Sequence, residues 1–423
     1  MTVTGAPASA TARPFNRDFV VVVSAALSYF VGLGILAPVL PRYIEDTLDG
    51  GGTEVGIAVG AFAVTAALLR PWVGRQGDRR GRRILLVGGA SVAAVATLGY
   101  GLPGGLAMLV LFRLLAGAGE AAAFVGAATT AQDLAPPGRR GQAASLFSIS
   151  VYGGLSFGPV LGDWIYRHHG PGWAWAAAAA FSLLGAAIAL LLPARLGMPE
   201  LPDDTTSVLG AVRARPPAAP SEAMGRRRWV HPAGLRPGIV LALGAAGYAG
   251  FSAFVPLYVD DIGIESAGPV FFEYGMIVLT VRVLASRLPD VLGARRGPIV
   301  ALVLQAAGLC LMGSVASPVG LYVSTAIYAA GVSLLYPSLF LAVLDAAPAA
   351  ERSQSIATFT MFFDVSQGIG APLLGVIVSL TDNRGAFIGG GLLSAAGLLF
   401  HRRDAPSVAG PVAEPCPPPE PGQ

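Results

Sequence analysis

The sequence predicts an all-α membrane protein, with about twelve transmembrane helices arranged as two six-helix bundles related by an internal repeat. Three observations lead to this fold class. Hydrophobic residues fill 54% of the 423 positions and charged residues only 13%, whereas soluble domains carry about 25% charged residues. Uncharged runs of about twenty residues, the length that crosses a bilayer, recur along the chain. Charged residues also repeat at a constant spacing between the two halves.

Each apolar run predicts one helix, and charged or proline-containing segments set its limits. The uncharged run 297–344 is too long for a single span, and Ser317 and Pro318 divide it because proline breaks a helix. We expect the helices at residues 18–41, 53–73, 84–102, 105–131, 142–165, 172–193, 237–259, 267–287, 297–315, 319–344, 354–380 and 385–401.

Hydrophilic segments separate the two expected bundles. A linker rich in Pro, Ala and Arg, residues 194–236, divides an N-terminal bundle at 18–193 from a C-terminal bundle at 237–403. The composition of residues 1–17 and of the Pro-rich residues 404–423 is typical of disordered tails. An even number of spans places both tails on the same side of the membrane.

The distribution of arginine indicates which side this is. The chain contains no lysine, and most of its 28 basic residues fall in the tails, linker and connections of one side. The positive-inside rule makes that side cytoplasmic, so we expect a multi-pass protein of the plasma membrane with both termini in the cytoplasm. A chain without lysine cannot form a P-loop, and active transport would therefore draw on an ion gradient.

A fixed offset of 212 positions aligns the two halves without gaps, pairing Arg70 with Arg282 and Asp78 with Asp290. Further pairs at this offset are Arg75 with Arg287, Gly81 with Gly293, Arg83 with Arg295, Asp133 with Asp345, Pro136 with Pro348, Arg140 with Arg352 and Gln142 with Gln354. Because charged residues are scarce, this agreement indicates two homologous six-span halves. Transporters built from parallel repeats hold their substrate between the halves, near the midplane.

Several stretches combine glycines and charged residues at spacings that resemble known motifs. GRQGDRRGRR (Gly74–Arg83) resembles the signature loop G-x-x-x-D-R-x-G-R-[RK] between spans two and three, and SRLPDVLGARR is a degenerate copy between spans eight and nine. RLLAGAGE (Arg113–Glu120) is similar to the R-x-x-x-G pattern of span four. GLSFGPVLGD (Gly154–Asp163) resembles the G-x-x-x-G-P-x-x-G-G motif of antiporters and exporters, with Asp163 in place of the last glycine.

These stretches resemble the motifs of the major facilitator superfamily. The resemblance, which extends over residues 18–403, implies a twelve-span efflux permease of the drug- or metabolite:proton antiporter type. It also implies a cytoplasmic latch in which Asp78, with Asp133 and Arg139 or Arg140, ties the two bundles together in the outward-facing state. The residues implied in this gate are Gly74, Asp78, Arg79, Gly81, Arg82, Arg83, Asp133, Arg140 and Asp290. The alternative is that the arginines only fix the topology and reach lipid headgroups.

Span five carries a stripe of small residues. Gly154, Gly158 and Gly162 recur at four-residue spacing, which permits close helix packing, and Pro159 adds a kink. We expect this face at the interface between the bundles, where it would shape the gate; ordinary tight packing is the alternative.

Three charged residues that fall well inside predicted spans are the main candidates for function, because each such charge costs about 2.5–3.5 kcal/mol unless it faces a cavity or a partner. Arg113 and Glu120 lie on one face of span four, and Asp364 lies near the middle of span eleven, with Tyr152 at its repeat position. Glu120 is the expected proton carrier, with Arg113 as the cation that exchanges with the proton. Asp364 is the rival carrier, and a static Arg113–Glu120 pair is the structural alternative.

Other polar and aromatic residues have less specific expectations. Glu273 and Asp163, near the outer ends of their spans, are expected to be solvated. The candidates for lining a mid-membrane substrate cavity are Tyr29, Tyr248, Tyr328 and Gln367, together with Phe251, Tyr274 and Tyr336. Packing inside the bundles is the alternative role for each of them.

Transport is the leading hypothesis: proton-driven export of a small molecule, with proton-coupled import of a nutrient such as a sugar or organic acid as the alternative. An enzyme is disfavoured because the four histidines fall outside the spans or at their ends, and no H-E-x-x-H motif is present. We expect no cofactor, metal or nucleic acid. The expected partners are a small-molecule substrate, protons and the lipid bilayer, with the monomer as the functional unit.

Overall fold

The computed structural model describes residues 16–102, 104–135, 140–194, 231–284, 288–346 and 352–403, and every regular element within these ranges is an α-helix. The helices are α1 (Arg17–Leu48), α2 (Gly52–Arg80), α3 (Arg82–Gly99), α4 (Gly105–Asp133), α5 (Arg140–His169), α6 (Pro171–Ala189), α7 (Pro232–Asp261), α8 (Gly268–Leu284), α9 (Leu288–Ser314), α10 (Pro318–Ala346), α11 (Arg352–Leu380) and α12 (Asn383–Arg403). Most of the expected tails and linker lies outside the described residues.

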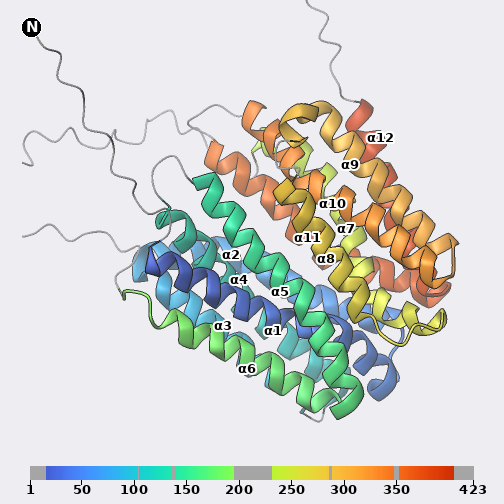
Figure 1. Cartoon of the computed structure of the whole chain (residues 1–423), viewed down its shortest axis with the longest axis horizontal. Coiled ribbons are helices and arrows are strands. Elements are labelled where there is room, and N and C mark those ends of the chain that lie inside the picture. Colours follow the sequence, from blue (N-terminus) through green and yellow to red (C-terminus); the bar gives the residue numbers. More distant parts are fainter. Residues whose placement is uncertain are drawn as a thin grey trace, which may run out of the picture.

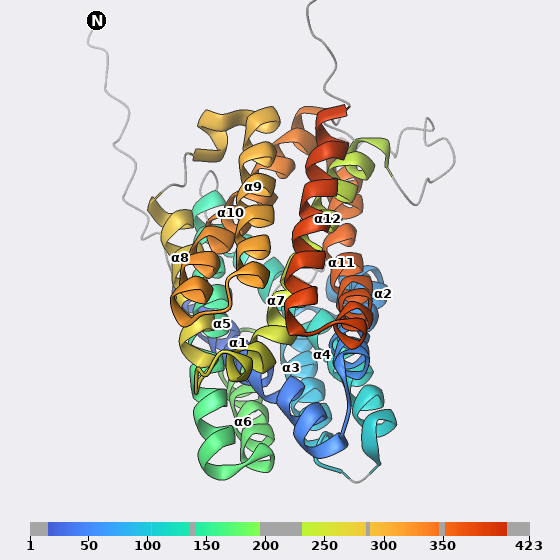
Figure 2. The same cartoon turned by 90° about the vertical axis from the view of Figure 1, so that its right-hand side faces the viewer.

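The described helices form two bundles, as the sequence predicts. α1–α6, coloured blue to green in Figure 1, make one bundle, and α7–α12, yellow to red, make the other. After a 90° turn, Figure 2 shows most of the second bundle above the first. Ten of the helices are long and apolar enough to cross a membrane. Helix α7 begins at Pro232, inside the segment expected to be linker.

Among the described residues, the apolar core joins the two bundles at one end only. At the end where α1 meets α2 and α7 meets α8, which we call the closed end, one buried cluster includes Ile44 of the first bundle and Val259 of the second. At the opposite end, which we call the arginine-rich end, each bundle has its own cluster, around Leu86 in one and Val343 in the other. Apolar packing therefore holds the bundles together at the closed end.

Small residues let helices of different bundles touch at the closed end. Gly56 of α2 faces the backbone of Ala371 of α11 with no room for a side chain between them. On the other side of the interface, Gly275 of α8 faces the side chain of Ser156 of α5, again with no room for a further side chain. Contacts of this small-residue type let backbones approach closely in membrane proteins. The pairs α2–α11 and α5–α8 consequently form the main contact between the bundles.

The signature motif is helical rather than a loop. Helix α2 continues through Gly74 and Gly77 to Arg80, and Gly81 then breaks the helix with a φ of 88°. Its repeat partner Gly293 interrupts α9 with a φ of 68°. Glycine adopts this left-handed region without steric cost, so the repeat extends to the backbone. The loop in the structure is shorter than the predicted one. Arginine is a good helix former, so α2 can extend beyond its apolar run.

Candidate functional site

Arg70 of α2 joins the two bundles through a buried charge centre. Its Nη1 lies 3.0 Å from Oδ2 of Asp364 on α11, and its Nη2 lies 3.4 Å from both carboxylate oxygens of Glu120 on α4. The guanidinium also lies over Phe124, 5.0 Å from the ring centroid. Only 8% of each carboxylate side chain is exposed, against 26% for Arg70. We call Arg70, Glu120 and Asp364 the Arg70 centre.

Arg113 does not pair with Glu120, which differs from the static pair that the sequence offered as the structural alternative. Its Nε donates to the carbonyl of Ala58 over 2.9 Å, and its Nη2 donates to that of Val59 over 3.4 Å. Its guanidinium lies 4.6 Å from the centroid of the Phe62 ring. Helices α2 and α4 cross so closely here that backbone carbonyl groups of α2 bind Arg113 of α4. The carboxylate of Glu120 is contacted instead by Arg70 of α2.

The repeat produces a second contact between the bundles. Nη2 of Arg282 on α8 donates to the hydroxyl of Tyr152 on α5 over 2.9 Å, and the guanidinium lies 4.5 Å from the centroid of that ring. The 212-position offset maps Arg70 onto Arg282 and Tyr152 onto Asp364. Each bundle thus supplies the arginine of one contact and the acceptor of the other. This repeat is the sequence signal that could have identified Arg70.

The expected cavity residues fall into separate groups. The ring centroids of Tyr248 and Tyr274 lie 5.5 Å apart and those of Tyr274 and Tyr328 lie 6.0 Å apart, inside the C-terminal bundle. Tyr29 lies in the N-terminal bundle beside a cavity of about 10 Å³. The side-chain amide of Gln367 donates to a backbone carbonyl of α7 over 2.9 Å. The structure therefore brings Tyr248 and Tyr328 together, but not with Tyr29.

The signature motif makes one described ion pair, within a single bundle. Nη1 of Arg82 at the start of α3 lies 2.9 Å from Oδ2 of Asp133 at the end of α4. The side chains of Asp78, Arg140 and Asp290 lie outside the described residues. A latch between the bundles at the arginine-rich end therefore stays a prediction.

The glycine stripe of α5 faces α1 of its own bundle rather than the other bundle. Gly158, in the middle of the stripe, packs against the backbone of Gly34 so closely that a side chain would not fit, and Gly154 and Gly162 also face α1. Helix α5 contacts α8 through Ser156, which lies on a different side of the helix. These residues therefore pack tightly inside their own bundle, which is the alternative that the sequence left open. The residues are Gly154, Gly158, Pro159 and Gly162.

Asp163 is buried in a polar cluster at the closed end, not solvated as expected. Its Oδ1 pairs with Nη1 of Arg42, and its Oδ2 accepts from Nε of Arg167 over 2.9 Å and from the hydroxyl of Ser266 over 2.6 Å. Nη2 of Arg42 lies 3.0 Å from Asp260 of α7. Only 2% of the Asp163 side chain is exposed. Because Ser266 and Asp260 belong to the C-terminal bundle, this Asp163 cluster ties the bundles together.

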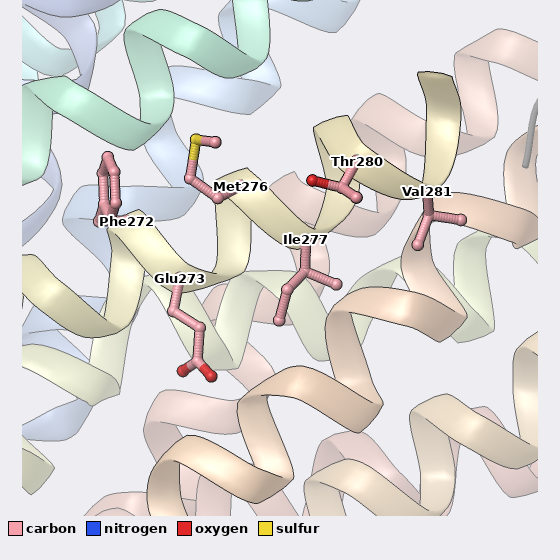
Figure 3. A pocket seen from close by; sticks show the side chains of 6 residues that line it. All are labelled: Phe272, Glu273, Met276, Ile277, Thr280 and Val281. Atoms are coloured by element: carbon pink, nitrogen blue, oxygen red, sulfur yellow. The ribbon is translucent and has the colours of Figure 1, made fainter. Parts of the chain in front are cut away.

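Glu273 lies beside a pocket of about 380 Å³ along α8. Figure 3 shows its carboxylate pointing away from Phe272 and Met276. One carboxylate oxygen, Oε2, is buried without a hydrogen-bond partner among the described residues, which differs from the expected solvated position. The lining residues are Phe272, Glu273, Met276, Ile277, Thr280 and Val281. Since all of them belong to α8, the pocket does not include the Arg70 centre.

Comparison with known proteins agrees with this architecture. A sequence model of the Major Facilitator Superfamily matches residues 22–296 and 266–415. The chain belongs to the major facilitator superfamily. Membrane transport of a small molecule is therefore its class of function, and it is a multi-pass membrane protein.

Relatives and solved structures support this assignment. The chain is 30% identical over 404 residues to an uncharacterized MFS-type transporter of Pseudomonas aeruginosa. The match covers 90% of this chain and 93% of the relative. It is 25% identical over 372 residues to the uncharacterized MFS-type transporter YhhS of Escherichia coli, covering 86% of each.

Two solved structures show the same fold. The chain matches the peptide transporter POT in complex with sulfate with a TM-score of 0.71 at 17% identity, covering 92% of this chain and 93% of that one. It matches a bacterial homologue of the human lysosomal transporter Spinster, in an inward-facing and unoccupied conformation, with a TM-score of 0.66 at 16% identity, covering 91% and 94%. At these identities the likeness concerns the fold alone.

Proposed function

We propose that the chain is a proton-coupled secondary transporter that works by alternating access, and the charge balance of the Arg70 centre carries this proposal. Glu120 and Asp364 share one guanidinium, so the centre bears an excess negative charge when both carboxylates are ionised. At membrane depth an uncompensated charge costs about 2.5–3.5 kcal/mol. Binding of a proton removes this charge, which makes the two carboxylates a proton-binding site.

The geometry links this proton to movement of the bundles. Arg70 and Glu120 belong to the N-terminal bundle, and Asp364 belongs to the C-terminal bundle. A proton on Asp364 removes the charge that attracts Arg70 across the interface, while Glu120 retains Arg70 in its own bundle. Proton binding therefore loosens a contact between the bundles and proton release restores it, as alternating access requires. This argument favours Asp364, the rival of Glu120 in the sequence-based expectation, as the coupling carboxylate.

Export is the direction that we propose, because the α5 segment Gly154–Asp163 resembles the motif of antiporters and exporters. Import together with a proton is the second candidate, and one observation favours it. Arg282 has a tyrosine rather than a carboxylate as its partner, so its charge can attract an anion that travels with the proton.

Orientation and assembly complete the proposal. The positive-inside rule assigns the arginine-rich end, with both termini, to the cytoplasm. A single chain holds both arginine contacts between its bundles, which supports the monomer as the functional unit.

Everted membrane vesicles test both coupling and direction. Candidate compounds come from comparing the resistance and export profiles of a deletion strain and an overexpressing strain. With the vesicle interior acidified, an exporter accumulates the compound and discharges the pH gradient, and the Arg70→Gln variant does neither. Accumulation only in right-side-out vesicles with acid outside supports import. A transport rate that does not depend on the pH gradient in either everted or right-side-out vesicles contradicts proton coupling.

A further inference from the structure

Arg282 carries a positive charge that no carboxylate balances among the described residues. Its Nη2 donates to Tyr152 over 2.9 Å, and its Nε is buried without a partner in the described part of the chain. Its repeat partner Arg70, by contrast, contacts two carboxylates. A charge without a counter-ion inside a membrane span is costly, and such residues mark substrate or ion pathways.

Tyrosine side chains lie in the neighbourhood of this guanidinium. Besides contacting Tyr152, Arg282 is near enough to Tyr274 of α8 and Tyr336 of α10 to act on their hydroxyl groups electrostatically. Tyr248 of α7 in turn interacts with Tyr152, and its ring stacks on that of Tyr274 with centroids 5.5 Å apart. These groups offer hydroxyl donors and flat apolar faces without adding a negative charge.

We propose that Arg282 binds the anionic group of the transported molecule, which is a small organic anion with a flat apolar body. A guanidinium presents a planar fork of N–H donors that matches a carboxylate or a phosphate. Tyr152 accepts from only one of these donors. The stacked rings of Tyr248 and Tyr274 are suited to the apolar body. The inference rests on the proposed transport function, but not on its direction.

The position of Arg282 suits a substrate site that both bundles share. The residue lies on α8 and contacts α5 across the interface. Tyr336 interacts electrostatically with Arg282 and also with Arg70 and Asp364, so the anion would lie next to the Arg70 centre. An aromatic ring compensates a cation only in part, and the contact with Tyr152 therefore leaves the guanidinium available to an anion.

Equilibrium binding to the purified full-length protein tests this site. The measurement uses a neutral detergent without phospholipid, so that neither a gradient nor a lipid headgroup takes part. Naphthoate, naphthamide and naphthylmethylammonium are suitable probes, because they share a ring system and differ in charge. We expect saturable binding of naphthoate at least about tenfold tighter than binding of the other two, since hydrogen bonds between charged groups are the stronger ones.

Three variants assign the preference to Arg282. Arg282→Gln should abolish the preference for naphthoate, whereas Arg282→Lys keeps the charge without the fork and should retain a weaker preference. Arg296→Gln removes an exposed arginine of α9 and should bind like the wild type. The melting temperature of each variant reports whether it is folded, and the lysine variant keeps the test decisive if the glutamine variant does not fold.

Three results would overturn the proposal: no saturable binding of naphthoate, equal binding of the three probes, or unchanged naphthoate binding in Arg282→Gln. Because no gradient is used, such a failure leaves proton coupling untouched. The opposite outcome is also distinguishable. If the folded protein prefers naphthoate because of Arg282 but its transport does not depend on a pH gradient, proton coupling is refuted and the anion site is supported.

Discussion

Arg70 and Asp364 form an ion pair of 3.0 Å from one bundle to the other, and the sequence repeat places Arg282 and Tyr152 in the corresponding contact. The two contacts differ in charge. Glu120 gives the first an excess of negative charge, and the second has a positive charge alone. This difference is the basis for proposing a proton site at the first contact and an anion site at the second.

The Asp364→Asn variant should lose gradient-driven accumulation while keeping substrate exchange without a gradient. The amide has the size of the carboxylate, and Arg70 then forms a balanced pair with Glu120 inside one bundle, so that no proton is needed. Counterflow and pH-driven accumulation in one proteoliposome preparation measure the two rates. Asp382→Asn, at an exposed position, is the matched control and should behave like the wild type. Full gradient-driven accumulation by Asp364→Asn would exclude Asp364 from the proton site.

The Glu120→Gln variant should be impaired in a different way. Without Glu120, the remaining pair of Arg70 and Asp364 is balanced and crosses between the bundles, which holds them together. We expect exchange and accumulation both to fall by about tenfold or more, the effect of about 1.4 kcal/mol. The same counterflow assay applies. Exchange that survives in Glu120→Gln but not in Asp364→Asn would reverse the roles of the two carboxylates.

The helices and the repeat could be predicted because they depend on composition and spacing, but the partner of Glu120 could not. Arg113 and Glu120 lie seven residues apart on one face of α4, which suggested a pair. The choice of partner depends on how α2 crosses α4, where Gly117 contacts the backbone of Phe62. No pattern within a single helix contains that information.

The Asp163 cluster was missed for a related reason. Arg42 was expected beyond the end of the first span, yet α1 continues to Leu48 and carries Arg42 inside the helix. Burial of Asp163 follows, because an arginine from α1 and polar groups from the other bundle surround it. The sequence contained one signal, the replacement of the last glycine of the motif by an acid.

Removing the buried carboxylate of this cluster should destabilise the protein more than removing the exposed one. Asp163→Asn leaves Arg42 with the half-exposed Asp260 as its remaining carboxylate partner, and breaking a buried pair costs up to about 3–5 kcal/mol. In Asp260→Asn the lost partner has a side chain that is 57% exposed, and exposed pairs are worth about 0.2–1 kcal/mol. Thermal unfolding of the purified variants measures the difference. Equal melting temperatures of the two variants would show that the buried carboxylate contributes no more stability than the exposed one.

Two glycine variants should separate packing inside a bundle from packing between bundles. Gly158→Leu overfills the contact between α5 and α1, so we expect loss of folded, monodisperse protein in gel filtration. Gly56→Leu fills the contact between α2 and α11, which should leave each bundle folded but hold the closed end apart and stop transport. A normal yield and normal transport for Gly158→Leu would contradict the close packing of its stripe.

Naphthoate binding should depend on pH in the wild type, and this dependence should vanish in Asp364→Asn. Tyr336 interacts with both Arg282 and Asp364, so a change of charge at Asp364 should alter the affinity for an anion at Arg282. The dissociation constant measured at a series of mildly acidic to neutral pH values provides the test. Identical pH profiles for the two proteins would show that the anion site and the proton site are independent.

The sign of this pH dependence decides the direction of transport. A proton on Asp364 removes a negative charge near Arg282, so direct electrostatic attraction predicts that acidification tightens naphthoate binding. Tighter binding means that the anion and the proton are carried together, which an inward proton gradient drives as import. Export by exchange, the direction proposed above, requires the opposite sign, because the protonated form must then release the anion. Tighter binding on acidification would therefore favour import, the second candidate. Direct attraction cannot make naphthoate bind more weakly at acid pH. Weaker binding would therefore have to come from the conformational change that follows when a proton on Asp364 loosens its contact with Arg70.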